Sequence, residues 1–240
     1  MRTPDVVGDI AMELVKEDSL GLTLDAINEA LFFGRDISDA QKLESANWIA
    51  GRQGLPGSYA DMFGITDYDR SSGYMVFTGE KIKTRAGTSH ILGEEASRAL
   101  ILLDVKDQEV TEALARATEG MMSRLVTQSG EIPQSCGIYC CGICSVSYWR
   151  HLAAGGLCDA DIRLEAAMET LSQHRIGDGR WKRFPFYYTL LALTEINNRQ
   201  VLEERRYAAP ICESYLNRKP KEDEISNRRR AVAERILAMC

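Results

Sequence analysis

The sequence contains no long hydrophobic run. Nowhere do about 18 apolar residues follow one another, so a membrane-spanning helix is not expected. The first residues, MRTPDVVGDIAMELVKED, carry acidic side chains where a secretory signal needs an uninterrupted apolar stretch, which predicts a soluble chain without such a signal. The alternation of apolar and polar residues that is typical of half-buried strands is almost absent as well. These absences argue against a membrane protein and against a β-sheet fold.

Three further signals of function are missing or scarce. The chain has 29 Lys and Arg against 35 Asp and Glu, a net charge of −6 with a pI near 5.3, so no nucleic acid partner is expected. It has only three histidines, His90, His151 and His174, which are too scattered to indicate a catalytic triad. The basic segment FTGEKIKTRAGTSH contains no Gly-x-Gly or phosphate-loop pattern.

The seven cysteines are an odd number, and four of them crowd at Cys136, Cys140, Cys141 and Cys144. This is not the pattern of a secreted disulfide framework, so we expect reduced thiols in the cytoplasm. Cys136, Cys140 and Cys144 fall on one stripe of an expected helix, which leaves three interpretations open. They pack in the core as small apolar residues, they bind a metal or cluster, or they include a reactive thiol. Four thiolates from a single helix do not readily close a tetrahedron around a metal.

Apolar residues recur at three- and four-residue spacing, which predicts an all-helical fold. The expected helices cover about 3–16, 23–33, 38–52, 89–103, 107–127, 137–154, 161–174, 185–197, 200–217 and 222–239. Ser38 and Gln41 form a capping box at one of these starts. The stretch at about 54–87 is rich in Gly, Ser, Asp and Tyr, and an irregular segment of that length is more often functional than idle. We therefore expect a single helical-repeat domain over 1–240 with an irregular insertion at about 54–87.

Three helix ends share one pattern: a glutamine, then a glycine, one residue and a bulky residue. The three copies are Gln53, Gly57 and Tyr59; Gln128, Gly130 and Ile132; and Gln173, Gly179 and Trp181. A repeat built from two helices cannot bury its apolar face alone, so neighbouring units must stack into a continuous core. The pattern predicts an array of helical hairpins.

The last copy resembles a known family. Gln173 to Trp181 is similar to the Q-x(2–5)-G-x-W turn of the squalene-hopene and oxidosqualene cyclases, and DGRWKRFPFYYTLLAL resembles a hairpin of those cyclases and of protein prenyltransferase β-subunits. The resemblance covers roughly residues 120–200 well and 40–105 poorly. It implies an α/α toroid in which outer and inner helices alternate around a central apolar cavity. Because the chain is too short for a full set of hairpins, we expect an incomplete or half ring.

The catalytic groups of that family are mostly absent. The cyclases protonate their substrate from an aspartate-rich motif. The nearest sequence here, Cys158-Asp159-Ala160-Asp161, is better interpreted as a helix cap. The prenyltransferases hold Zn²⁺ with an aspartate, a cysteine and a histidine, and the resemblance places Gln134, Cys136 and Tyr188 there. Two of these three ligands are lost, so no metal site is assigned, and zinc remains possible only through a different set of cysteines.

The resemblance also suggests which residues bind a ligand. The candidates are Trp181, Phe186, Tyr187 and Tyr188 as cavity walls, Cys136 and Cys140 on the neighbouring inner helix, and His174, Asp178 and Arg180 at the cavity mouth. Two alternatives stay open: Trp181 is a wedge between repeats, and the segment from His174 to Arg180 is a solvated turn. Separately, the basic residues of FTGEKIKTRAGTSH, namely Lys81, Lys83, Arg85 and His90, precede a helix and form either an anion site for a diphosphate or carboxylate or an exposed loop.

Two functions from different classes remain. The first is a cytoplasmic prenyltransferase- or terpene-cyclase-like repeat protein that binds an isoprenoid or similar lipophilic ligand, with no catalytic residue assigned. The alternative is a non-catalytic helical-repeat module for protein interactions, which has lost the family's chemistry and forms a homodimer that covers its apolar edges. A redox or metal protein built on the cysteine cluster is a third possibility.

Overall fold

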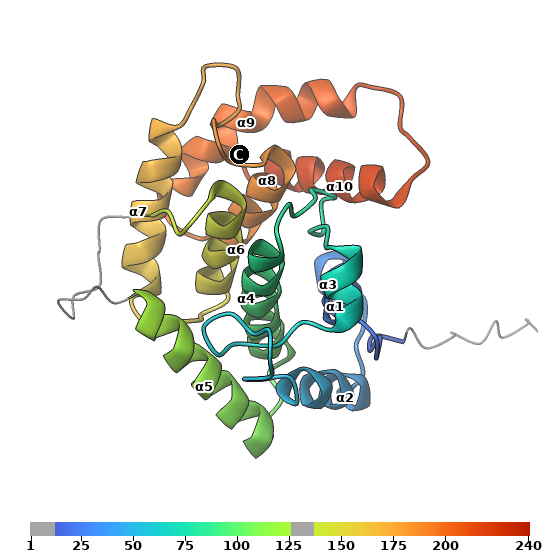
Figure 1. Ribbon diagram of the computed structural model, residues 1–240. Coiled ribbons are helices and arrows are strands. Elements are labelled where there is room, and N and C mark those ends of the chain that lie inside the picture. The colour runs from blue at the N-terminus through green and yellow to red at the C-terminus, as the bar shows by residue number, and fades with distance from the viewer. Residues whose placement is uncertain (1–12, 126–136) are drawn as a thin grey trace, which may run out of the picture.

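The computed structural model describes residues 13–125 and 137–240, and this part of the chain is all-helical, as predicted (Figure 1). Its helices are α1 (Leu20–Phe33), α2 (Asp39–Ala50), α3 (Asp67–Ser72), α4 (Arg85–Leu103), α5 (Gln108–Leu125), α6 (Gly142–Ala153), α7 (Ala160–Gln173), α8 (Phe186–Glu195), α9 (Val201–Leu216) and α10 (Glu224–Ala238). Within these described ranges there is no β-strand, only isolated bridges. No helix there is both long and apolar enough to cross a bilayer.

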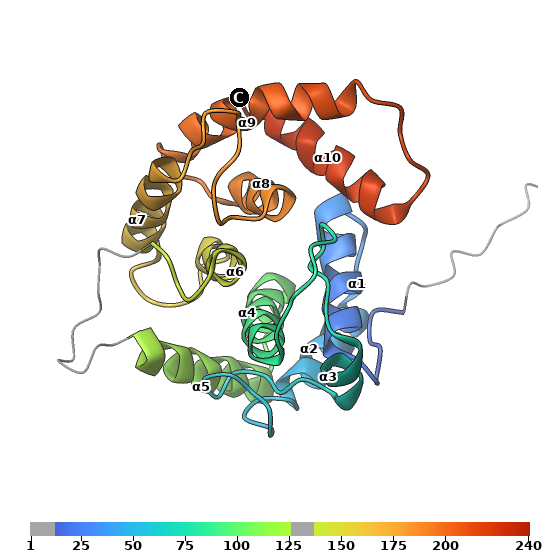
Figure 2. The same cartoon turned by 45° about the horizontal axis from the view of Figure 1, so that its top comes forward.

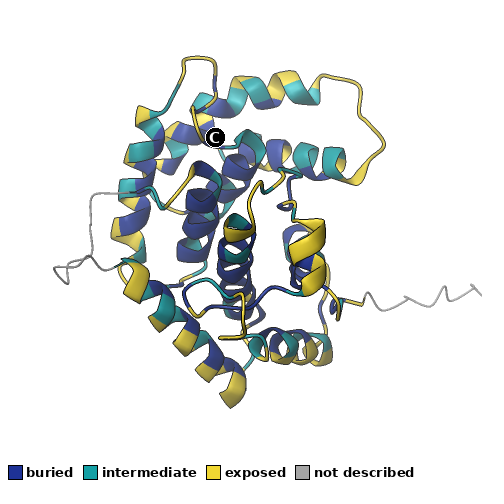
Figure 3. Cartoon of the chain, viewed as in Figure 1, coloured by how far each residue is buried: buried dark blue, intermediate teal, exposed yellow. Residues whose placement is uncertain are grey.

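Helices α4, α6 and α8 lie inside the molecule, with α4 against α6 and α6 against α8 (Figure 2). Helices α5, α7 and α9 lie outside them, so the chain alternates between interior and exterior from α4 to α9. Figure 3 shows the consequence for burial: the interior helices are buried almost all round, whereas α5 and α7 expose one face. The helical-hairpin arrangement follows from this alternation.

The first and last described helices are joined through arginine side chains. Arg228 on α10 donates to Asp25 at 2.8 and 2.9 Å and to Glu29 at 2.7 Å, both on α1. Arg235 donates to the carbonyl oxygen of Phe32 at 2.7 Å. In a half ring the first and last hairpins would not touch. Here the contacts of Arg228 and Arg235 join the last helix, α10, to the first described helix, α1.

Local capping explains where several helices begin. The capping box at the start of α2 is present as predicted, since Ser38 Oγ accepts from Gln41 N and Gln41 Oε1 accepts from Ser38 N. Helix α1 begins at Leu20, earlier than the expected Thr23, because Ser19 Oγ caps it by accepting from Leu22 N at 3.0 Å. The helix expected over 3–16 lies mostly outside the described residues, and its last part, 13–16, is not helical.

The irregular segment contains a helix that the sequence pattern did not predict. Helix α3 has a capping box between Thr66 and Asp69. The buried Asp69 carboxylate also accepts from Ser19 Oγ at 2.5 Å, Leu20 N at 3.0 Å and Gly21 N at 3.1 Å, so it stabilises the amino end of α1. One side chain thereby holds the insertion against the helical array. A six-residue helix is too short to show an apolar period, which is why periodicity missed it.

The repeat turns are related, but not in the register that the sequence pattern suggests. An antiparallel bridge joins Gln53 to Phe63 after α2, and the corresponding bridge joins Arg175 to Trp181 after α7. The structural counterpart of Trp181 is therefore Phe63 and not Tyr59. Both are buried, at 0% and 4% exposure for Phe63 and Trp181. The glutamine, glycine and bulky residue of the remaining copy, at 128–132, lie outside the described residues.

Candidate functional site

The beginnings of the three interior helices line one cavity of about 690 Å³, which we call the amino-end cavity. It is lined by Tyr59, Glu80, Lys81, Ile82, Lys83, Thr84, Ala86, Gly87, His90, Cys140, Cys141, Gly142, Ile143, Cys144, Arg183, Phe184 and Pro185. Because α4, α6 and α8 all start here, the positive ends of their dipoles face the same region. Thr84 Oγ1 caps α4 by accepting from Gly87 N at 3.0 Å, whereas α6 has no side-chain cap. Such a place favours an anionic group.

Glycine at the start of α6 lets the cavity walls approach each other. A Cβ atom added to Gly142 would collide with the carbonyl oxygen of Arg183, so no other residue fits between these two segments without a shift. Arg183 itself has a left-handed backbone, with φ at 77°. The segment between the α7 turn and α8 therefore lies directly against the first residue of α6.

The cavity has a cationic rim. Lys81, Lys83 and Arg183 are exposed, and none of them forms an ion pair among the described residues. The lining carboxylate Glu80 is engaged elsewhere, since it accepts from Thr78 Oγ1 at 2.5 Å and from Tyr188 N at 3.2 Å in the first turn of α8. Burial raises the pKa of Glu80. The rim is thus electropositive. Lys81 and Lys83 of the basic run are exposed, as in an exposed loop, and they line a cavity, as an anion site would require.

Three thiols meet in the wall of the cavity. The Sγ atoms of Cys140, Cys141 and Cys144 all lie within 4.8 Å of one another, and those of Cys141 and Cys144 are 3.4 Å apart. Helix α6 begins only at Gly142, and Cys140 has φ at 61°, so the expected helical stripe of cysteines is wrong. A turn brings the sulfurs together. Cys136 lies outside the described residues.

Among the described residues, these three sulfurs are the group that most resembles a metal site. Three ligand atoms are present, and no histidine, aspartate or glutamate atom of the described chain joins them within the same radius. Zinc in a closed structural site takes four ligands. Burial and the neighbouring Cys141 raise the pKa of the Cys144 thiol.

His90 occupies the inner wall of the cavity. It is 2% exposed and lies between the rings of Tyr59 and Tyr139, with centroid distances of 4.5 and 4.8 Å. Its Nε2 is 3.3 Å from Glu94 Oε1, one helical turn further along α4. Glu94 also contacts His151 Nδ1 on α6. Burial acts to raise the pKa of Glu94, but the His151 and His90 imidazoles outweigh it and hold that pKa at about 2.

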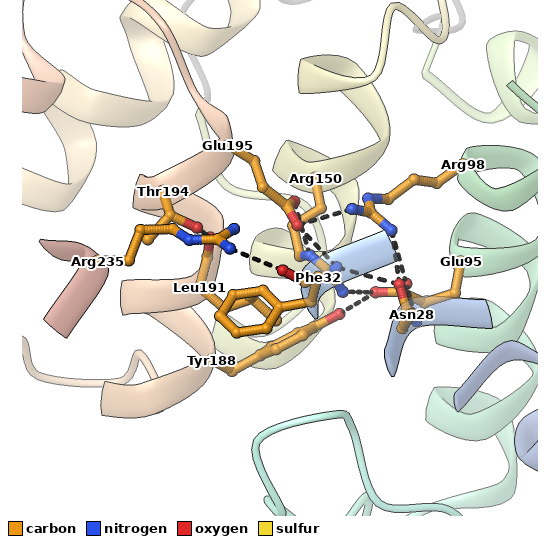
Figure 4. A network of polar contacts seen from close by, with 10 residues as sticks. All are labelled: Asn28, Phe32, Glu95, Arg98, Arg150, Tyr188, Leu191, Thr194, Glu195 and Arg235. Carbon is orange, nitrogen blue, oxygen red and sulfur yellow. Dashed lines mark hydrogen bonds and ion pairs between the residues drawn. The ribbon is translucent and has the colours of Figure 1, made fainter. Parts of the chain in front are cut away.

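Further along the interior helices lies a second cluster, which we call the central polar network: Asn28, Glu95, Arg98, Arg150, Tyr188 and Glu195 (Figure 4). Arg150 donates to both oxygens of Glu195, at 2.9 and 3.0 Å, and also contacts Glu95. Tyr188 OH donates to Glu95 at 2.6 Å. Arg98 donates to Glu195 and to Asn28, both at 2.7 Å.

This network is balanced in charge, with two arginines and two glutamates. Burial acts to raise the pKa of Glu95, but the Arg150 and Arg98 charges overcome it, so the pKa lies below its usual value. Buried charges of this kind are tolerated only when they are paired and hydrogen-bonded. The network therefore links α1, α4, α6 and α8, and none of its residues lines the amino-end cavity.

The predicted aromatic wall is divided among separate environments, and none of its four residues lines the amino-end cavity. Tyr188 belongs to the central polar network. Trp181 Nε1 donates to the buried Glu204 at 2.7 Å, and its ring packs against Phe186 and Tyr207, as a wedge between repeats would. Tyr187 contacts Tyr215 and the guanidinium of Arg229.

The predicted mouth residues also lie elsewhere. His174 Nδ1 donates to the carbonyl oxygen of Thr170 at 2.8 Å, and Asp178 forms an exposed ion pair with Arg180 at 3.1 Å. None of these three residues lines the amino-end cavity, whereas the candidate Cys140 does. Tyr59 and Arg183 were not expected at a ligand site, since each lies in an irregular segment.

Comparisons with protein-family models, with curated proteins and with solved structures find no significant match for this chain. Function is therefore argued from the geometry of the amino-end cavity and the residues around it.

Proposed function

We propose that the chain is a prenyltransferase- or terpene-cyclase-like helical-repeat protein that binds an isoprenoid or similar lipophilic ligand with an anionic group. The ligand occupies the amino-end cavity. The observation that carries this proposal is the meeting of an apolar lining with Lys81, Lys83 and Arg183 in one cavity of about 690 Å³. Pockets for small ligands typically have volumes of about 300–1,000 Å³ and a mostly apolar lining with a few polar groups.

The two parts of such a ligand have separate partners. Ile82, Ile143 and Phe184 offer apolar contact to a hydrocarbon chain, which gains free energy when it leaves water. An anionic head gains from the cationic rim and from the start of α6, whose amino end has no side-chain cap. The alternation of interior and exterior helices supports the proposed kinship with the α/α toroid families.

Binding is the proposed function, and no reaction is assigned to it. The six described cysteines are free thiols, which supports a reducing compartment, and we propose the cytoplasm. The central polar network fills the region between the interior helices where the toroid families have an apolar cavity, so the proposed site lies at the ends of those helices.

The test compares a charged and a neutral probe of the same length. Calorimetric titration with farnesyl diphosphate and with farnesol measures both affinities at low and high salt. We expect the diphosphate to bind at least about tenfold more tightly, and this preference to shrink with salt because exposed charges are screened. Failure of both probes to bind overturns the proposal, and equal affinity overturns the role of the cationic rim.

A steric variant and a matched control locate the binding. Ala86 is exposed in the first turn of α4 and lines the cavity, so Ala86→Trp fills it without disturbing the core. Ala115 is exposed on the exterior helix α5 and does not line the amino-end cavity, so Ala115→Trp adds the same surface outside that cavity. We expect Ala86→Trp to abolish binding and Ala115→Trp to leave it unchanged. The ligand-induced rise in melting temperature provides an independent readout.

The second candidate function is a protein-interaction module that forms a homodimer. Leu22, Tyr68 and Met75 are 49%, 48% and 46% exposed, and all three line one groove of about 480 Å³ between α1, α3 and α10. An apolar surface of this kind favours association with a second copy. Sedimentation of the wild-type chain and of Met75→Asp tests the idea. A monomer at every concentration contradicts it, and a dimer that Met75→Asp dissociates supports it.

A further inference from the structure

We propose that Cys141 and Cys144 form a redox-active dithiol that exchanges with disulfides at the wall of the amino-end cavity. This activity goes beyond the binding of a lipophilic anion and does not depend on it. The two residues occur as Cys141-Gly142-Ile143-Cys144, with Cys141 at the N-cap of α6 and Cys144 in its first turn. Their Sγ atoms are 3.4 Å apart.

The Cys141 and Cys144 sulfurs are close enough for a disulfide to form with a small shift. Positions three apart in a helical turn have Cβ atoms about 5–6 Å apart, and a disulfide needs Cβ atoms about 3.5–4.5 Å apart. Cys141 is an N-cap residue with extended backbone, at φ −125° and ψ 172°, and does not have the helical geometry that sets the longer distance. The S–S bond of about 2.05 Å then requires a shift of only about 1.4 Å between the two sulfurs.

The two thiols differ in the way that an exchange reaction requires. Cys141 is exposed and can meet an incoming disulfide, whereas Cys144 is 2% exposed and lies beside Cys141 and Cys140. Cys141 also stands at the positive end of the α6 dipole and accepts no competing cap bond.

The charge around the sulfur group argues against a bound cation. Lys81, Lys83 and Arg183 line the same cavity as the sulfurs and carry no carboxylate partner among the described residues. Their positive charges disfavour a divalent metal in this cavity. The sulfur group also lacks a fourth ligand atom from the described chain. A dithiol uses the two sulfurs that are in contact and needs no further ligand.

The reaction is a two-electron exchange with a disulfide substrate of small-molecule or protein origin. The Cys141 thiolate attacks one substrate sulfur, the substrate S–S bond breaks, and the first substrate thiolate leaves. Cys144 then loses its proton and attacks the Cys141 sulfur, which releases the second substrate thiolate. The two thiolates take up the two protons that Cys141 and Cys144 gave up. The dithiol is oxidised to a disulfide, and the substrate is reduced to two thiols.

The experiment equilibrates the full-length reduced protein with graded ratios of oxidised to reduced glutathione. After acid quenching and alkylation of the remaining thiols, intact mass measures the loss of two hydrogens, and peptide mapping locates the new bond. We expect a Cys141–Cys144 disulfide. Cys141→Ser and Cys144→Ser each remove one of its two sulfurs and should therefore abolish it, whereas Cys140→Ser and the exposed Cys158→Ser should retain it. Circular dichroism checks that each variant is folded.

Two outcomes overturn the proposal. The first is an absence of the Cys141–Cys144 disulfide at every glutathione ratio in the folded wild-type protein. The second is a stoichiometric cobalt complex of the reduced protein, with thiolate-to-cobalt absorption that Cys140→Ser, Cys141→Ser and Cys144→Ser each remove, since that result makes the sulfurs a metal site. Neither outcome bears on farnesyl diphosphate binding, so the two proposals fail separately.

Discussion

The amino ends and the middle turns of the same three interior helices handle charge in opposite ways. In the middle, Arg150 and Arg98 are buried and each is bonded to Glu195, so every charge has a partner (Figure 4). At the amino ends, Lys81 and Lys83 stand exposed around an apolar cavity without a carboxylate partner among the described residues. The charges in the middle are already paired with one another within the fold, whereas the lysines at the amino ends are available to bind a ligand.

The difference has a simple physical origin. A charge moved from water into the interior loses several kcal/mol of hydration, which only close partners of opposite charge and good geometry recover. A charge at the surface keeps its hydration and needs no partner, so its position is free to serve binding. We therefore expect substitutions in the middle to change stability and substitutions at the amino ends to change binding.

The largest effect is expected from Arg150→Met. Methionine has a similar length, but it leaves the carboxylates of Glu95 and Glu195 without their main partner. Removal of one member of a buried ion pair costs about 3–5 kcal/mol of unfolding free energy. Guanidinium denaturation measures the change. The control is Arg180→Met, which removes an exposed pair with Asp178 and should cost less than about 1 kcal/mol. Equal losses in the two variants would break the comparison.

A pH-dependent effect is expected at Glu94. Its pKa is lowered from 4.5 to about 2 in the folded protein, so its charge contributes stability above pH 4.5 that is lost as the pH falls toward 2. The shift corresponds to stability of the order of 3 kcal/mol. Glu94→Gln lacks this contribution, so its unfolding free energy should approach that of the wild type between pH 5 and pH 2. Denaturation at several pH values measures the difference, and a constant gap contradicts the role of the carboxylate.

The smallest effect on stability is expected from Lys83→Gln, at the amino end. Because the side chain is exposed, its loss should change the unfolding free energy by less than about 0.5 kcal/mol. The affinity for farnesyl diphosphate should nevertheless fall about fivefold, or about 1 kcal/mol, while the affinity for farnesol stays unchanged. Titration calorimetry measures both probes. A loss of farnesol binding would show that Lys83 acts through the shape of the cavity.

Several features of the fold follow from local sequence signals. The period of apolar residues predicted the long helices, and the spacing of Ser38 and Gln41 predicted a capping box that is present. The basic residues Lys81 and Lys83 are visible in the sequence just before α4, but the sequence left open whether they form an anion site or an exposed loop. Each of these signals involves residues only a few positions apart, so the sequence alone is enough to read it.

Other features depend on partners that are distant in the sequence. Glu94 and Glu95 are visible as two acidic residues in the apolar stretch of α4, but their partners His151, Arg150 and Tyr188 lie 57, 55 and 93 residues away. The correspondence of Phe63 with Trp181 is likewise visible only in the structure, where each residue forms the β-bridge of its own turn. A single sequence contains no signal for such pairings.

By itself, the sequence determined that the chain is helical, where most helices begin and that positive charge precedes α4, because capping and periodicity act over a few residues. Only the tertiary structure decided that the amino ends of α4, α6 and α8 meet at one cavity, that Cys140, Cys141 and Cys144 converge in its wall, and that the buried charges are paired. The packing of the interior helices against one another sets these positions. That packing depends on the whole chain, because it must pair the buried charges and cover the apolar surfaces at the same time.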